Sequence, residues 1–262
     1  MAKRKTKWGE RTYKRFLKEG RGQGDLSLYK PWLTTHDFPS LGTVTRVMGR
    51  VTNRVHHLLS KLEFQCFLYL ESLPGIEDIK EQYPLPLEHT QLIASRLGIN
   101  HPYVNGYPYV MTTDFYFKQF NVWHAIQVKP SSVLNDSRVQ EKLKIEKAYF
   151  DKIGVEWRLM TEKELNKDLA DNLLWLNAGA SLEQLIPNQR LQQELEEAFI
   201  ELYSDMTIPF HTILKEIDHV FNFSIGTGMQ LFKSLIKSRK ITLDLTRKIN
   251  LQDPRVLPYL KV

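Results

Sequence analysis

The chain lacks the features that would place it in an oxidising compartment or in a membrane. Its 262 residues include a single cysteine, Cys66, so no disulfide can form within the chain and no thiolate cluster can bind zinc. No apolar run approaches the roughly 20 residues that a membrane-spanning helix requires. The opening residues, MAKRKTK, lack the apolar segment of a secretory signal. We therefore expect a cytoplasmic protein with no membrane partner.

Most of the chain has no excess of positive charge, because the basic excess lies at its start. The net charge is +6, yet residues 1 to 30 hold ten Lys or Arg against three Asp or Glu, so the rest sums to −1. Such a basic arm commonly contacts phosphate backbones, although a solubilising tail has the same composition. Residues 181 to 224 carry eight acids and two bases, and residues 225 to 262 the reverse. One half could face a protein partner and the other DNA.

The length favours two domains, each with its own core. Residues 1 to 55 are rich in Gly, Pro and aromatic residues without sustained periodicity, which predicts a loop-rich lead-in. The elements expected after it are a helix over 56–72, a strand over 76–84, a helix over 87–98, strands from Val110 and Val122 joined by a turn at 119–121, a helix over 139–153 and a strand over 155–161. This mixed order predicts an α/β or α+β domain over residues 1 to 165.

Residues 166 to 262 have a mostly helical pattern. The next helix is expected to start at Thr161, which has capping-box spacing with Glu164. Several short helices then lead to a basic helix and to the β-rich piece ITLDLT at 241–246. This order is similar to a winged helix-turn-helix, so we expect a second domain that contacts partners and DNA.

Polar residues that suit a metal site fall on the two central β runs and the helix before them. Because side chains alternate along a strand, Gln127 and Lys129 point to one face. Asp114 lies on the neighbouring run, and pairing of the two strands would bring it to the same edge. Glu63 can approach from the expected helix, where a carboxylate on a buried face needs a cation.

These oxygen ligands are of the hard kind that magnesium prefers. They suit hydrolysis of a phosphodiester, in which two ions could bracket the scissile phosphate. Lys129 could orient or deprotonate the attacking water, or offset charge in the transition state, and the product would have a 3′ hydroxyl and a 5′ phosphate. An Asp followed by a polar–apolar–Lys triplet is nevertheless common, so the chemistry alone leaves the site open.

Ordered segments between about residue 15 and residue 165 form a more specific pattern. They are KEGRGQG at 18–24, Tyr29, PWLT at 31–34, Pro39-Ser40, RVHHLLSKLE at 54–63, EQYPL at 81–85, His101-Pro102, TDF at 113–115 and IQVKP at 126–130. With Glu63, Asp114, Gln127 and Lys129, they resemble the TnsA endonucleases of heteromeric bacterial cut-and-paste transposases, which have a restriction-endonuclease-like, PD-(D/E)XK core. Gln127 stands where that superfamily usually has a second acid, which is the TnsA family's own variant. The C-terminal third matches only in general character.

The resemblance implies a reaction and a set of partners. In this family the enzyme nicks the 5′ ends of the transposon, while a TnsB-type transposase cuts the 3′ ends and joins them to target DNA. A TnsC-type AAA+ ATPase contacts the C-terminal region and links the enzyme to target selection. By the same resemblance Glu63, Asp114 and Gln127 hold Mg²⁺, for which Mn²⁺ can substitute, and Lys129 is the catalytic lysine. The protein would be bacterial and associated with the nucleoid when on DNA.

Other polar residues have a functional and a structural interpretation. Arg21 lies between glycines in GRGQG and could contact phosphate. His56 and His57 could contact DNA or position a metal-bound water, although packing or capping at a helix start explains them better. Lys233 and Lys237 could bind the DNA backbone, and a solvated basic face is nearly as good an explanation.

Two further expectations concern Glu146 and the missing nucleotide motif. Glu146, on the helix after the Gln127 strand, could support the metal ligands, or it could pair with Lys142 in solvent. GKS and GKT are absent from the sequence, so we do not expect ATP hydrolysis. Two alternative functions remain open, a stand-alone restriction or repair nuclease and a non-catalytic DNA-binding adaptor.

Overall fold

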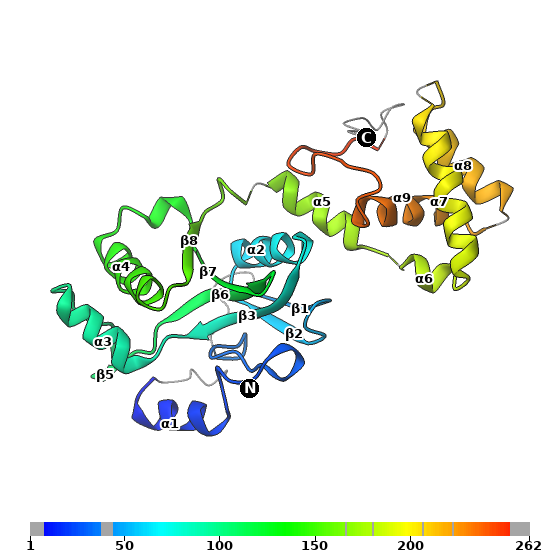
Figure 1. Cartoon of the computed structure of the whole chain (residues 1–262). Helices are drawn as coiled ribbons and strands as arrows, with labels where there is room; N and C mark the ends of the chain where they lie inside the picture. Colours follow the sequence, from blue (N-terminus) through cyan, green and yellow to red (C-terminus); the bar gives the residue numbers. More distant parts are fainter. Residues whose placement is uncertain are drawn as a thin grey trace, which may run out of the picture. The chain divides into compact units, whose positions relative to one another are not determined.

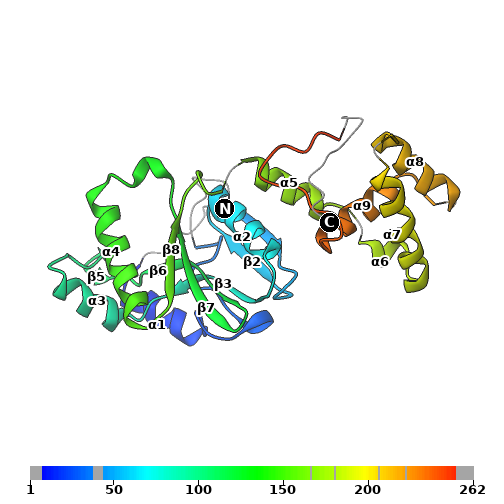
Figure 2. The same ribbon diagram turned by 45° about the horizontal axis from the view of Figure 1, so that its top comes forward.

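The computed structural model describes residues 8–37, 44–165, 167–179, 181–205, 207–221 and 223–251. The contacts divide the chain into two compact units, residues 1–165 and 166–262 (Figures 1 and 2). Residues 1–7 of the basic arm and the Pro39-Ser40 segment lie outside the described residues.

A four-stranded sheet forms the centre of the first unit, in the order β3-β6-β7-β8 (Figure 1). Its strands are β3 (Ile76–Pro84), β6 (Thr112–Gln119), β7 (Val122–Val128) and β8 (Glu156–Met160). β6 is antiparallel to both β3 and β7. β8 is parallel to β7, because helix α4 (Ser137–Lys152) carries the chain back across the sheet. The predicted mixed α/β architecture is confirmed.

One face of the sheet is covered by helix α2 (Lys61–Ser72). Its buried Phe67 and Leu70 join a hydrophobic cluster with the strand residues Phe115 and Ile126. Because the helix packs here, its first turn lies at the sheet, and this turn contains Glu63.

The other face is covered by α3 (Leu87–Arg96) and α4 (Figure 2). Ile145 and Phe150 of α4 pack with Ala125, the neighbour of Ile126 on β7, so adjacent residues of this strand serve opposite cores. These helices and the β6–β7 hairpin agree with the sequence prediction. The other short elements after β3 are the hairpin β4 (Tyr103–Val104) and β5 (Tyr107–Pro108), and the 3₁₀ helix η2 (Ser131–Val133).

The described part of the first 55 residues is rich in turns and loops, as its composition predicts, but it also contains short helices and strands and an aromatic core. Trp8, Phe16 and Trp32 form an aromatic cluster with Val110, so the segment packs instead of running free over the surface. The paired strands β1 and β2 follow this cluster in the chain. The elements found here are α1 (Glu10–Lys18), the 3₁₀ helix η1 (Leu26–Leu28), β1 (Thr45–Met48) and β2 (Val55–Leu58).

The helix predicted to begin at His56 begins later, at Lys61. His56 and Leu58 are buried at alternate positions of β2, which is the period of a strand. The hydroxyl of Ser60 accepts a hydrogen bond from the backbone N–H of Glu63 at 3.1 Å, so Ser60 is the N-cap. The prediction failed because the apolar positions around residue 58 fit helical and strand spacing equally well.

The second unit is helical. Phe232 lies at the centre of its core, with ring centroids 4.7 Å from Phe210 and 5.7 Å from Phe199. No helix in the described part of the chain is long and apolar enough to cross a membrane. The helices of this unit are α5 (Lys167–Asn177), α6 (Leu182–Leu185), α7 (Gln189–Ser204), α8 (Phe210–Val220) and α9 (Thr227–Lys237).

Two predictions for the second half of the chain need correction. The Glu164 carboxylate accepts hydrogen bonds from the backbone and hydroxyl of Thr161, but the next helix begins only at Lys167. The β-rich piece at 241–246 is not a strand, and residues 167–251 contain no strand wherever they are described. Asp244 instead closes a turn by accepting hydrogen bonds from the N–H and hydroxyl of Thr246. The predicted wing is therefore absent from the described residues.

Candidate active site

Asp114 joins strand β6 to the end of β7. Its buried carboxylate accepts hydrogen bonds through Oδ2 from the N–H of Val128 at 2.8 Å and from Lys129 Nζ at 3.3 Å. The N–H of Asp114 donates to Gln127 Oε1 at 3.1 Å. The pairing of the two strands thus brings Asp114, Gln127 and Lys129 to one edge, as the alternation along the strands led us to expect.

Glu63 reaches the same place from the first turn of α2. Its Oε2 accepts hydrogen bonds from the N–H of Leu59 at 2.8 Å and from Gln82 Nε2 at 3.2 Å. The same Gln82 Nε2 donates to Asp114 Oδ1 at 3.1 Å. One amide group therefore connects the two carboxylates, which lie 51 positions apart in the sequence.

Sequence reasoning missed Gln82. It lies in EQYPL, a segment that carried the family resemblance, but a polar residue in an amphipathic strand gave no sign that it was buried. Its neighbour Glu81 also proves to be buried, with a bidentate ion pair to Arg54 at 2.8 and 2.5 Å. Consecutive polar residues that are buried in a strand indicate a functional site, but their burial can be seen only in the tertiary structure.

Glu146 of α4 is a further buried acid at the site. Its carboxylate accepts a hydrogen bond from Trp157 Nε1 at 2.9 Å, and Glu146 is only 2% exposed. This burial excludes the alternative of a solvated helix acid paired with Lys142.

The site holds more negative charge than its lysine can balance. Burial, together with the charge of Asp114, raises the pKa of Glu63 from 4.5 to about 7. Burial raises the pKa of Glu146 to about 8, despite hydrogen bonds to its carboxylate. Burial lowers the pKa of Lys129, but the charges of Asp114, Glu146 and Glu63 more than offset this, so its pKa is raised.

This donor set fits a divalent cation. No three His, Cys, Asp or Glu side chains are gathered into a ready metal cluster in the described part of the chain. The candidate ligands are instead two carboxylates, Glu63 and Asp114, and the amide oxygen of Gln127, which are hard oxygen donors. A buried carboxylate pair with one lysine as its cation is costly, and a divalent ion would remove that cost.

The residues at the start of the chain that were considered for DNA contacts are engaged inside the protein. The guanidinium of Arg21 donates to Asp37 at 2.6 Å and lies 3.6 Å from the centre of the Phe16 ring. His56 is fully buried, with Nδ1 2.7 Å from Glu81 Oε2. His57 is half-buried, and burial lowers its pKa, so it is not a cation at neutral pH.

The two lysines of α9 differ from each other. Lys233 is 5% exposed and donates to the backbone oxygen of Ala178 at 2.9 Å, so it is not the exposed cation that the sequence suggested. Its amine also lies 5.1 Å from the centre of the Trp175 ring. Lys237 is exposed.

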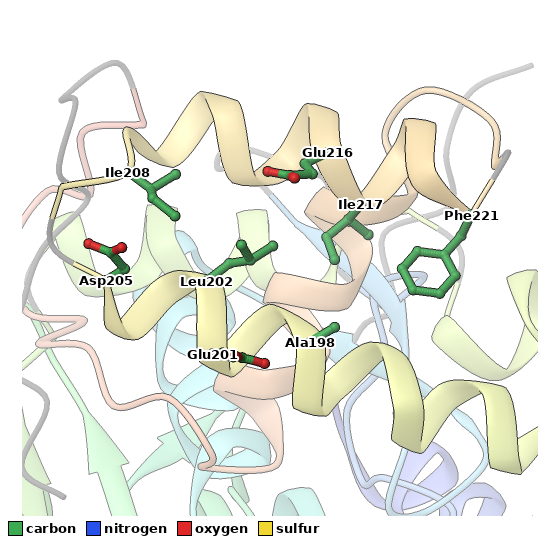
Figure 3. Close-up of a pocket in the computed structure, with 8 residues that line it drawn as sticks. All are labelled: Ala198, Glu201, Leu202, Asp205, Ile208, Glu216, Ile217 and Phe221. Carbon is green, nitrogen blue, oxygen red and sulfur yellow. The ribbon is translucent and has the colours of Figure 1, made fainter.

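A groove of about 400 Å³ lies between α7 and α8 in the second unit (Figure 3). Figure 3 shows Leu202 and Ile217 between the two helices, with Phe221 toward one end. Its lining combines apolar residues with three exposed acids: Ala198, Glu201, Leu202, Asp205, Ile208, Glu216, Ile217 and Phe221.

The fold of the first unit and the site around Glu63 and Asp114 together define a class of protein. A mixed sheet whose adjoining strands bring Asp114 and Lys129 to one edge, with Glu63 of a packed helix beside them, is that of a restriction-endonuclease-like nuclease that acts through a divalent metal cation. Residues 73–162 match the family described as TnsA-like endonuclease N terminal, and residues 164–245 match TnsA endonuclease C terminal. The chain is 36% identical over 249 residues to the Transposon Tn7 transposition protein TnsA of Escherichia coli. The alignment covers 90% of this chain and 86% of that protein. The chain belongs to the TnsA endonuclease family.

Proposed function

We propose that the chain is the magnesium-dependent endonuclease subunit of a transposase, and that it nicks the 5′ ends of the transposon during cut-and-paste transposition. The relative in Escherichia coli is named as a transposition protein, and this chain aligns with most of its length. The observation that carries the proposal is the meeting of Glu63 and Asp114 through one shared amide, with Lys129 bonded to the second oxygen of Asp114.

Glu63, Asp114 and Gln127 are the residues that would hold Mg²⁺, and we propose two ions per site. Bound ions would activate water and stabilise charge on the phosphate oxygens. The amine of Lys129 donates to Asp114 Oδ2 at 3.3 Å, so it lies where it could offset charge in the transition state and orient or deprotonate the attacking water. Attack of water would leave a 5′ phosphate and a 3′ hydroxyl.

The proposal is tested by strand-specific mapping of cuts at transposon ends, with purified partner proteins present and absent. We expect 5′-end cuts that depend on Mg²⁺ and on a TnsB-type transposase, and their loss in Asp114→Ala and Lys129→Ala. Asp151→Ala, which removes an exposed acid of α4, is the control and should cut normally. Cutting of naked DNA without partners would support a stand-alone nuclease. Full cutting by both site variants would support a non-catalytic adaptor.

We propose that the second unit, residues 166–262, contacts a TnsC-type ATPase and DNA. Support comes from the groove between α7 and α8, because its apolar floor and three acids suit a basic amphipathic segment of a partner. The excess of acids over bases across residues 181 to 224 favours the same occupant.

The partner contact is tested by reversing the charge of Glu201 and Glu216 together to lysine. Recruitment by the ATPase should weaken, while Mg²⁺-dependent nuclease function with the transposase persists. Glu183→Lys on α6, outside the groove, is the control. Recruitment that is unchanged by the double variant would contradict the assignment of the groove.

A further inference from the structure

We infer that Gln82 is a positioning residue. Its amide holds the carboxylates of Glu63 and Asp114 together in the metal-free protein, and its hydrogen bonds to them break when a divalent ion binds. The inference rests on the proposed function, because it concerns the same two carboxylates. It adds to that function a residue and a step in the loading of the site.

The chemistry of the neighbours fixes which way the amide points. Nε2 lies 3.2 Å from Glu63 Oε2 and 3.1 Å from Asp114 Oδ1, while Oε1 accepts a hydrogen bond from the Thr112 hydroxyl at 3.1 Å. Carboxylates only accept hydrogen bonds, so the NH₂ group must face them, and a hydroxyl can donate to the amide oxygen. Gln82 is 3% exposed, so water does not compete with these bonds.

The backbone of β3 is shaped to aim this side chain. Gln82 has φ 48°, a left-handed conformation that residues with a side chain rarely adopt. Ile79 packs with the α2 cluster and Tyr83 with the α3 and α4 cluster, although residues four apart in a regular strand share a face. The alternation of side chains between the two faces of β3 is therefore reversed at Gln82. This residue lies between Glu81 and Tyr83, which pair with Phe115 and Thr113 of β6.

Buried bonds hold the chain on both sides of this irregular residue. The backbone oxygen of Gln82 accepts a hydrogen bond from the backbone N–H of Trp32 at 3.2 Å. The preceding Glu81 is bound by Arg54 and lies 2.7 Å from His56 Nδ1. The position of the amide is thus set by fixed surroundings, which is what a positioning residue requires.

The amide would compete with an ion for the space between these two oxygens, and Glu63 Oε2 already accepts two hydrogen bonds. Glu63 and Asp114 would supply carboxylate ligands to a divalent ion, and the N–H groups of Gln82 point at the same two carboxylates. Lys129 is bonded to the other oxygen of Asp114, so it does not fill this place. The Thr112 hydroxyl can accept as well as donate, and the amide can therefore turn away from the carboxylates without losing its partner.

The test is Mn²⁺ binding to the full chain, measured by calorimetry in wild type and Gln82→Met. Met keeps the length of the side chain but has no amide, so the ion no longer displaces two charge-assisted hydrogen bonds. We expect Mn²⁺ to bind about tenfold more tightly, and the metal-free protein to melt at a lower temperature in EDTA. Gln193→Met, which changes an exposed amide of α7, is the matched control and should alter neither quantity.

A second variant covers the case in which Gln82→Met fails to fold. Thr112→Val removes only the hydroxyl that orients the amide, and it should tighten Mn²⁺ binding by a smaller factor. Unchanged or weaker binding in the variant that folds would overturn the inference, because a purely structural residue lowers stability without raising affinity. Wild-type binding that Asp114→Ala leaves unchanged would instead overturn the proposed metal site itself.

Discussion

Replacing Glu63 by glutamine is expected to stabilise the metal-free protein at alkaline pH while it abolishes cleavage. Glu63 is 8% exposed and shares the Gln82 amide with Asp114. Burial and the charge of Asp114 raise its pKa from 4.5 to about 7. A glutamine at this position has similar shape and no charge, so it removes the repulsion and keeps the packing.

The sign follows from the raised pKa. A carboxyl group whose pKa is higher in the folded state contributes stability that is fully present below 4.5 and is lost as the pH rises through about 7. The difference between the two values corresponds to about 3 kcal/mol. The free energy of unfolding of Glu63→Gln should therefore rise relative to wild type by up to about 3 kcal/mol between about pH 5 and pH 9.

The measurement is urea denaturation of the full chain in EDTA at several pH values. Glu88→Gln, which changes an exposed acid of α3, is the control and should show little dependence on pH relative to wild type. Excess Ca²⁺ at pH 8 should stabilise wild type more than Glu63→Gln, because only wild type has both carboxylates. A difference between Glu63→Gln and wild type that is the same at every pH would refute the reasoning.

Three further outcomes are expected. Lys129→Met should reduce cleavage by about 100-fold or more in a reconstituted strand-cutting assay while Mn²⁺ binding persists, because the amine supplies charge and no ligand. Arg54→Met should lower the free energy of unfolding by about 3–5 kcal/mol in urea denaturation at neutral pH, since it removes the bidentate guanidinium partner of the buried Glu81 carboxylate. Gly22→Ala should lower the melting temperature more than Gly98→Ala does: both have positive φ, but the new Cβ at position 22 would lie 2.3 Å from a proline ring atom, and at position 98 it meets open space.

Local patterns in the sequence were sufficient for the part of the site that lies on β6 and β7. Alternation along a strand has a period of two, so Gln127 and Lys129 had to share a face, and a short turn made pairing with the run of Asp114 the simplest topology. The same kind of signal located α3, α4 and β8. Where two periods fitted equally well, as at His56, the local pattern failed, because the choice between strand and helix depended on pairing with β1.

Only the tertiary structure decided which polar side chains are buried and what they touch. Arg21, His56 and Lys233 have the residue types of DNA contacts, yet each is bonded within its own unit. Gln82 has no distinctive local signal, yet it joins Glu63 to Asp114. By itself the sequence determined the family, the order of the elements around the site and the chemistry of its ligands. Burial and hydrogen-bond partners are properties of segments that meet in space, so they follow from the packing of the whole unit and from no local pattern.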